Sequence, residues 1–138
     1  MKRIIEKYKY NNVLLIDDNE LDNFINEKIV EAQFYARNIH VRTNGKSALE
    51  FINNLIISDG SMNSTFPEVI FVDLNMPIMN GFEFIELFKK INDPKLYVCK
   101  IVILTSSISN SDKVKAEKMG GGIIFVNKPL TNEILNKL

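Results

Sequence analysis

Three aspartates stand directly after short apolar runs of the sequence. Asp17 and Asp18 follow the run Val13–Ile16, and Asp73 follows the run Val69–Val72. Carboxylate oxygens are the ligands that hard cations prefer, and Mg²⁺ is the cation that keeps part of its water shell beside one or two carboxylates. Three carboxylates in one crevice repel each other unless a cation lies among them. If the fold brings these aspartates together, we therefore expect a Mg²⁺ site.

A hydroxyl and an ammonium group follow two further apolar runs. Thr105 comes after Ile101–Leu104, and Lys128 comes shortly after Ile123–Val126. A lysine supplies a mobile positive charge for a phosphoryl oxygen, and a threonine hydroxyl donates to a second oxygen. Either residue alone is ordinary, but together with the acids they are typical of a phosphoryl-transfer site whose nucleophile is an aspartate.

The four apolar runs do not alternate with polar residues, which is typical of strands that are covered on both faces of a parallel sheet. A weaker, more polar run, Asn38–Val41, suits an edge strand. Apolar residues at helical spacing lie between and after the runs. They are Leu21, Phe24, Ile25, Ile29 and Ala32; Ala48, Leu49, Phe51, Ile52, Leu55 and Ile56; Phe82, Ile85, Phe88 and Ile91; Val114 and Met119; and Ile134, Leu135 and Leu138.

Strands and helices thus alternate five times, which predicts an α/β fold with a doubly wound five-stranded parallel sheet. A weak second strand suits the strand order 2-1-3-4-5, because that order places the second strand at an edge. Ligands of such sheets bind at the carboxyl ends of the strands where the strand order reverses. Asp17, Asp18 and Asp73 would face one another there.

Length and composition limit the remaining possibilities. The chain has 138 residues, a length that fits one domain. Its 17 basic and 17 acidic residues leave no net charge, which argues against direct nucleic-acid binding. One cysteine, Cys99, and one histidine, His40, exclude a disulfide framework and a cysteine-based or histidine-rich metal site. No membrane span and no secretory signal are apparent, so we expect a cytoplasmic protein. We expect a domain over residues 12–138 after an extension over 1–11, with an inserted loop over 58–67.

The motifs in order resemble the CheY-like receiver domain of two-component response regulators, over residues 11–137. The matching stretches are Val13–Glu20, Val72–Gly81, Ile103–Ser107 and Phe125–Leu130, together with the turn Asn44–Leu49. This resemblance implies a flavodoxin-like fold and a phosphoprotein that acts in phosphorelay signal transduction, not an enzyme.

The resemblance also implies roles for single residues. Asp73 would accept a phosphoryl group from a sensor histidine kinase or a histidine phosphotransfer protein. Asp18, Asp73 and the backbone carbonyl of Asn75 would hold Mg²⁺, and Asp17 would complete the metal site by ordering a metal-bound water. Thr105 would bind a phosphoryl oxygen.

Further implied roles concern the conformational change that follows phosphorylation. Lys128 would bind a second phosphoryl oxygen, aimed by a cis peptide before Pro129. Thr105 would turn toward the phosphoryl group, and Phe125, which stands where the family more often has tyrosine, would move into the space behind it. The surface formed by the fourth helix, the run Ile123–Val126 and the final helix would then change its affinity for an unknown downstream protein. That surface would also carry any weak dimer of an otherwise monomeric chain.

Three other functions are compatible with parts of the pattern. A phosphohydrolase of the haloacid dehalogenase type also uses an aspartate nucleophile and Mg²⁺, but it needs an acid two residues later, where this chain has Asn75. A receiver-like scaffold that is never phosphorylated would be marked by loss of an acid or of the lysine, and all are present. A flavodoxin would need a phosphate-binding loop rich in Ser, Thr and Gly after the first strand. No output domain follows, so we expect a stand-alone receiver.

Overall fold

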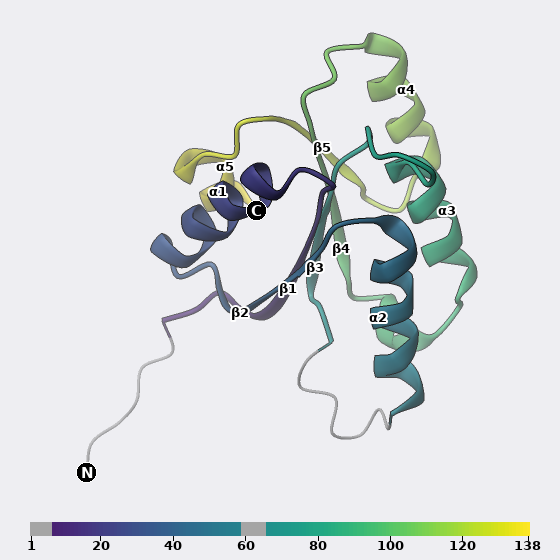
Figure 1. Cartoon of the computed structure of the whole chain (residues 1–138), viewed down its shortest axis with the longest axis horizontal. Helices are drawn as coiled ribbons and strands as arrows, with labels where there is room; N and C mark the ends of the chain where they lie inside the picture. Colours follow the sequence, from purple (N-terminus) through teal and green to yellow (C-terminus); the bar gives the residue numbers. More distant parts are fainter. Residues whose placement is uncertain (1–6, 59–65) are drawn as a thin grey trace.

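The computed structural model describes residues 7–58 and 66–138, which form one parallel sheet with helices on both faces (Figure 1). The strand order is β2-β1-β3-β4-β5, as predicted. The strands are β1 (Tyr10–Ile16), β2 (Ala36–Arg42), β3 (Val69–Val72), β4 (Lys100–Thr105) and β5 (Ile124–Asn127). The helices are α1 (Glu20–Ala32), α2 (Gly45–Ile57), α3 (Gly81–Lys90), α4 (Asn110–Met119) and α5 (Asn132–Lys137), with a short 3₁₀ turn, η2 (Pro94–Leu96).

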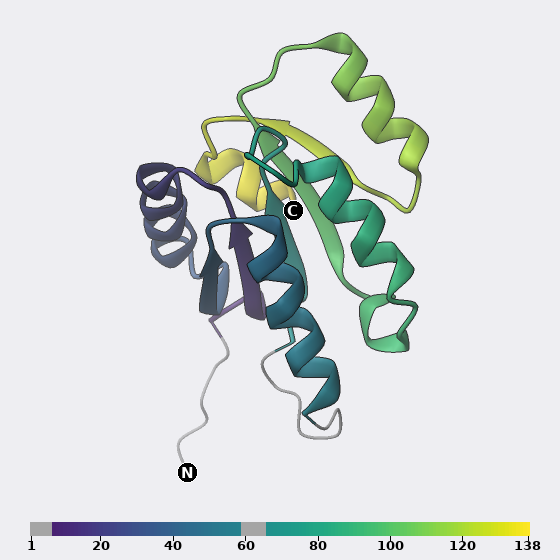
Figure 2. The same cartoon turned by 45° about the vertical axis from the view of Figure 1, so that its right-hand side comes forward.

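Two helical layers cover the sheet. Helices α1 and α5 lie on one face, and α2, α3 and α4 lie on the other (Figures 1 and 2). Successive residues of β1 enter opposite cores: Leu14 packs in the cluster under α2 and α3, and Leu15 packs in the cluster under α1 and α5. Both side chains are fully buried. Because both faces are covered, the central strands need apolar residues at every position, which explains the uninterrupted apolar runs.

The edge strand β2 is longer than the predicted run Asn38–Val41. Its pairing with β1 extends from Tyr10 opposite Ala36 to Ile16 opposite Arg42. Strand β1 therefore includes the last two residues of the segment expected as an extension. Residues 1–6 of that extension, and residues 59–65 of the expected insertion, lie outside the described residues.

Helix α1 forms where the periodicity predicts it, but it turns a different face to the core. Asn23, Asn26 and Val30 are its buried residues, whereas Leu21 and Phe24 are more than half exposed. The Nδ2 of Asn23 donates to the backbone carbonyl of Asp17 at 2.8 Å and ties the helix to the end of β1. The bond pairs a buried amide with a carbonyl at a strand end, and leaving either group buried without a partner would be costly.

Three of the helices, α1, α2 and α3, begin at asparagine caps. Asn19, Asn44 and Asn80 each accept a hydrogen bond from a backbone N–H in the first turn of α1, α2 and α3. Such caps satisfy donors that a helix leaves free at its start. In the loop before α3, Ile78 has a positive φ of 71° and is fully exposed, an unusual backbone state for a β-branched residue. Among the described residues, no helix is long and apolar enough to cross a membrane.

Candidate functional site

The backbone of the site continues the hydrogen-bond ladders of the sheet. The amide of Asp17 donates to the carbonyl of Arg42 at 3.2 Å, and the amide of Asp73 donates to the carbonyl of Ile16 at 3.0 Å. The amide of Lys128 donates to Thr105 at 2.8 Å. Each of these residues lies just beyond its strand, so the sheet itself fixes where its side chain starts.

Three carboxylates meet at this edge of the sheet. Asp17, Asp18 and Asp73 each offer an oxygen, and these oxygens lie within 4.8 Å of one another. Asp17 and Asp73 are buried and Asp18 is exposed. Among the described residues, the Oδ1 of Asp73 is buried without a hydrogen-bond partner. A buried carboxylate oxygen without a donor, beside two more carboxylates, fits a hard cation such as Mg²⁺.

Burial raises the pKa of Asp17, and the negative charge of Asp73 adds to this effect, while hydrogen bonds from Lys128 and from the amide of Asn19 oppose it. The side chain of Asp17 accepts from that amide at 2.9 Å. The hydrogen bonds from Lys128 and Asn19 thus offset part of the repulsion between the carboxylates of Asp17 and Asp73.

Lys128 supplies the compensating charge. Its Nζ lies 2.7 Å from Oδ2 of Asp17, 2.8 Å from Oδ2 of Asp22 and 3.6 Å from Oδ2 of Asp73. Burial alone would lower the pKa of Lys128, but its hydrogen bonds to Asp17 and Asp22 raise the pKa above its ordinary value. The ammonium is therefore charged at neutral pH. The peptide bond between Lys128 and Pro129 is cis.

Thr105 ends β4 and is fully buried. Its Oγ1 accepts from the amide of Ser107 at 3.1 Å. The hydroxyl of Ser107 donates to Asp112 of α4 at 2.6 Å, and the side chain of Asn127 in β5 donates to the carbonyl of Ser107 at 2.6 Å. Thr105 is thus connected through one serine to both α4 and β5.

Two residues singled out from the sequence lie near these groups. Phe125 in β5 is partly buried and packs on the core under α2 and α3. Asn75 is exposed in the loop after Asp73 and lines a hollow of about 360 Å³ with Pro77 and Asp112.

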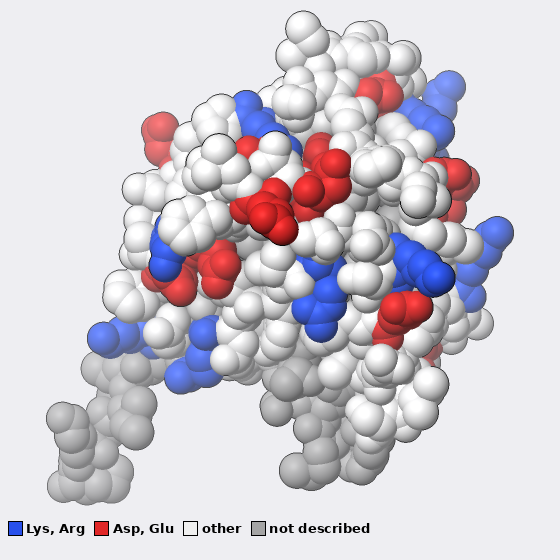
Figure 3. Space-filling model, in the orientation of Figure 1, with Lys and Arg blue, Asp and Glu red and all other residues white. Residues whose placement is uncertain are grey.

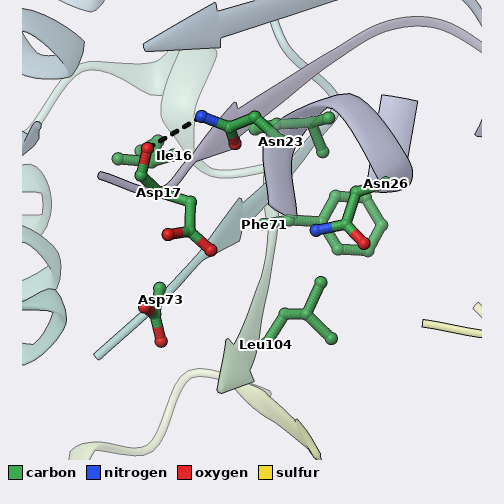
Figure 4. Close-up of a pocket in the computed structure, with 8 residues that line it drawn as sticks. Ile16, Asp17, Asn23, Asn26, Phe71, Asp73 and Leu104 are labelled. Carbon is green, nitrogen blue, oxygen red and sulfur yellow. Dashed lines mark hydrogen bonds between the residues drawn. The ribbon is translucent and has the colours of Figure 1, made fainter. Parts of the chain in front are cut away.

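Sequence reasoning missed two polar residues of α1 at this site. Asp22 accepts a hydrogen bond from the ammonium of Lys128. Asn23 lines a small hollow with Asp17, Asn26 and Asp73 (Figure 4). In that view the carboxylates of Asp17 and Asp73 lie near each other, and the amide of Asn23 reaches back to the chain at Asp17. The only signal in the sequence was the polarity of Asn23 and Asn26 within an otherwise amphipathic helix.

The surface charge agrees with a site for a cation. Acidic side chains gather near the carboxyl end of β1 on the face shown in Figure 3. Exposed Asp18 belongs to this edge of the sheet, while Asp17 and Asp73 lie deeper. A cluster of one sign attracts and concentrates ions of the opposite sign.

Comparison with known proteins agrees with this geometry. The family described as "Response regulator receiver domain" matches residues 13–138. A two-component response regulator from Cytophaga hutchinsonii has a similar solved structure, with a TM-score of 0.81 and 34% identity over 92% of each chain. The bacteriophytochrome response regulator AtBRR has a TM-score of 0.72 and 28% identity, over 94% of this chain and 89% of that one.

Among curated proteins, a protein-glutamate methylesterase/protein-glutamine glutaminase of Treponema denticola is 32% identical over 125 residues, which are 90% of this chain and 30% of that protein. A probable transcriptional regulator of Porphyra purpurea, ycf29, is 28% identical over 94% of this chain and 54% of that protein. The chain thus spans about a third to a half of the length of these two relatives. The matched family, the predicted strand order and the acidic pocket with its lysine lead to one assignment: the chain belongs to the response regulator receiver domains, which are phospho-accepting signalling modules.

Proposed function

We propose that Asp73 is the phosphoacceptor of this receiver. The observation that carries the proposal is the state of its carboxylate: Oδ1 is buried without a partner among the described residues, and Oδ2 lies 3.6 Å from the ammonium of Lys128. In the reaction, an oxygen of Asp73 forms a bond to phosphorus while the bond from phosphorus to the donor's imidazole nitrogen breaks. The imidazole keeps the electron pair and takes a proton from solvent.

Asp18, Asp73 and the backbone carbonyl of Asn75 would hold Mg²⁺, and Asp17 would orient a water bound to it. When bound, the ion supplies positive charge that offsets the repulsion between the acceptor carboxylate and the phosphoryl oxygens. The cluster of three carboxylate oxygens within 4.8 Å supports this assignment. The ammonium of Lys128 offsets part of the repulsion among the carboxylates themselves through its contact with Asp17.

Lys128 and Thr105 would bind the phosphoryl oxygens. Phosphorylation adds close to two negative charges and three strong acceptors at Asp73. The hydroxyl of Thr105 would turn to donate to one of them, which would disturb the bond that its oxygen accepts from Ser107. Phe125 would then move toward the vacated space, and the surface of α4, β5 and α5 would change. Coupling of this kind is typically about 1–3 kcal/mol.

The phosphodonor would be a sensor histidine kinase or a histidine phosphotransfer protein, in the cytoplasm, and the output would be a downstream protein that reads the surface of α4, β5 and α5. This surface would also carry any weak self-association. Family membership supports the first assignment, because receivers take their phosphoryl group from histidine. The equal numbers of basic and acidic residues, 17 of each, support a protein and not a nucleic acid as the downstream partner.

The direct test is the intact mass of the protein after incubation with acetyl phosphate, with and without Mg²⁺. We expect one Mg²⁺-dependent phosphoryl adduct in the wild type and in Asp93→Asn, a control aspartate beside η2. We expect none in Asp73→Asn. Folded protein that binds Mg²⁺ but gains no adduct would instead indicate a receiver-like scaffold. An adduct that persists in Asp73→Asn would move the acceptor to another residue.

A further inference from the structure

Lys128 is shared by two carboxylates from different elements. Asp17 stands at the end of β1 and belongs to the carboxylate cluster, whereas Asp22 stands in the first turn of α1 and is outside it. The distances from Nζ are nearly equal, 2.7 Å to Asp17 and 2.8 Å to Asp22. The exposed fraction of the side chain is 5% for Asp17 and 35% for Asp22, so the two contacts lie at different depths.

This arrangement matters because the ammonium of Lys128 and a bound Mg²⁺ ion would both need the same carboxylates. An ammonium group has three N–H donors, and here two of them are directed at Asp17 and Asp22. The third carboxylate, Asp73, is 3.6 Å away. A divalent ion that enters the cluster draws on Asp17 and Asp73 as well, and like charges at this range repel strongly. The ammonium then needs a carboxylate outside the metal site.

We propose that Asp22 is a positioning residue that holds Lys128 at the rim of the pocket, so that Mg²⁺ and the lysine occupy the site together. The proposal rests on the proposed function, since it concerns the same Mg²⁺ site and the same lysine. Asp22 does not touch the metal. It gives the ammonium a partner when Asp17 turns toward the ion, and it keeps the lysine beside the place where the phosphoryl oxygens arrive.

The test is the affinity for Mg²⁺ alone, measured by isothermal titration calorimetry on the full chain. Asp22→Asn keeps the size of the side chain and removes its charge. Because the contact is partly exposed, we expect Mg²⁺ to bind about three- to fivefold more weakly. Asp22→Glu restores the carboxylate and should recover most of the affinity.

Glu20→Gln is the matched control, because Glu20 is an exposed acid in the same turn of α1. It removes the same charge from a side chain for which the structure shows no contact to Lys128, and we expect it to change the affinity by less than about 1.5-fold, since solvent and salt screen an exposed charge. If Asp22→Asn and Glu20→Gln weaken Mg²⁺ binding equally, the effect is general electrostatics and the proposal is wrong.

A double-mutant cycle with Lys128→Met isolates the contact. Removing the competing ammonium should tighten Mg²⁺ binding, and in that background Asp22→Asn should have little further effect. A full effect of Asp22→Asn without the lysine would show that Asp22 acts on the ion directly and would overturn the proposal. Wild-type protein that takes up no Mg²⁺ would overturn the proposed function itself, whereas binding that is unchanged in Asp22→Asn would overturn only the role of Asp22.

Discussion

Lys89, near the end of α3, donates from Nζ to the backbone carbonyl of Met119 at 2.9 Å and so caps the last turn of α4 from a neighbouring helix. Helix α4 has few other ties to the fold. Its one buried residue is Ala116, and the residue that caps its C-terminus, Gly120, has a φ of 68°. The C-terminal carbonyls of a helix need such donors, and the positive charge also interacts favourably with the helix dipole. This single lysine therefore contributes to the placement of a helix on the surface that we propose to change on phosphorylation.

Lys89→Met should lower the free energy of unfolding by about 0.5–1 kcal/mol, because the lost bond is charged but exposed. Urea denaturation followed by circular dichroism measures the change. Lys90→Met is the control, since Lys90 is the exposed neighbour in the same last turn of α3. Equal midpoints for the two variants would remove the capping role.

Gly81→Ala should destabilise the fold by about 2–3 kcal/mol, the range for overpacking at a site that cannot relax. A Cβ at Gly81 would collide with the backbone carbonyl of Asp73 and approach the Cα of Leu74. Relief would displace the backbone that carries Asp73, so Mg²⁺ binding should weaken as well. Both quantities are measurable on one sample, by urea denaturation and by calorimetry.

Gly45→Ala is the comparison for this variant. The atom in the way there is the Sδ of Met79, the far end of a flexible side chain that can move aside. We expect a smaller loss of stability and no loss of Mg²⁺ affinity. A loss as large as that of Gly81→Ala would contradict the steric explanation.

Stability should fall as the pH drops below about 6.5, in part through His40. Burial, helped by the positive charge of Arg42, lowers the pKa of His40 below 6.5. The unfolded chain therefore binds a proton at a higher pH than the folded chain does, so acid favours unfolding through this window. His40 is the single histidine, so its proton resonances give its pKa directly, and His40→Gln should flatten the pH dependence of the urea midpoint.

Ser107→Ala should lower stability by about 1 kcal/mol and loosen the loop between β4 and α4. The Ser107 hydroxyl donates to Asp112 and accepts from the amide of Ser109. Ser106→Ala, at the exposed neighbour, is the control and should change little. Backbone relaxation of α4 by NMR measures the loosening, and unchanged order in Ser107→Ala would contradict the connecting role of the serine.

The sheet and its edge could be predicted from the sequence because their signals are local. A strand buried on both faces must be apolar throughout, as Val69–Val72 is, and the polar residue that follows it must lie at the carboxyl end. The full length of β2 was not apparent, because its ends, at Ala36 and Arg42, carry no strand pattern of their own and are set by pairing with β1.

The face of α1 and the contact of Asp22 could not be predicted, because both depend on distant partners. The periodicity of α1 indicates a helix, but its rotation depends on the bond from Asn23 to the carbonyl of Asp17. Asp22 meets a lysine 106 residues later in the chain, and no spacing rule relates two such positions. Asp17, Asp18, Asp73 and Lys128 were identifiable because each follows a strand, which places them at one edge by topology alone.

The amides of Asp17, Asp73 and Lys128 remain bonded to neighbouring strands, although all three residues lie beyond the strands that carry them. Each hydrogen should therefore exchange with deuterium as slowly as the sheet amides beside it. The Asp73 bond joins the central strands β3 and β1, whereas the bonds of Asp17 and Lys128 join the edge strands β2 and β5 to their neighbours. The exposed loop at Asn75 should exchange quickly. Such a contrast in exchange rates would indicate that the backbone at the strand ends stays fixed on phosphorylation. The rate of the response would then be set by motions of side chains and loops.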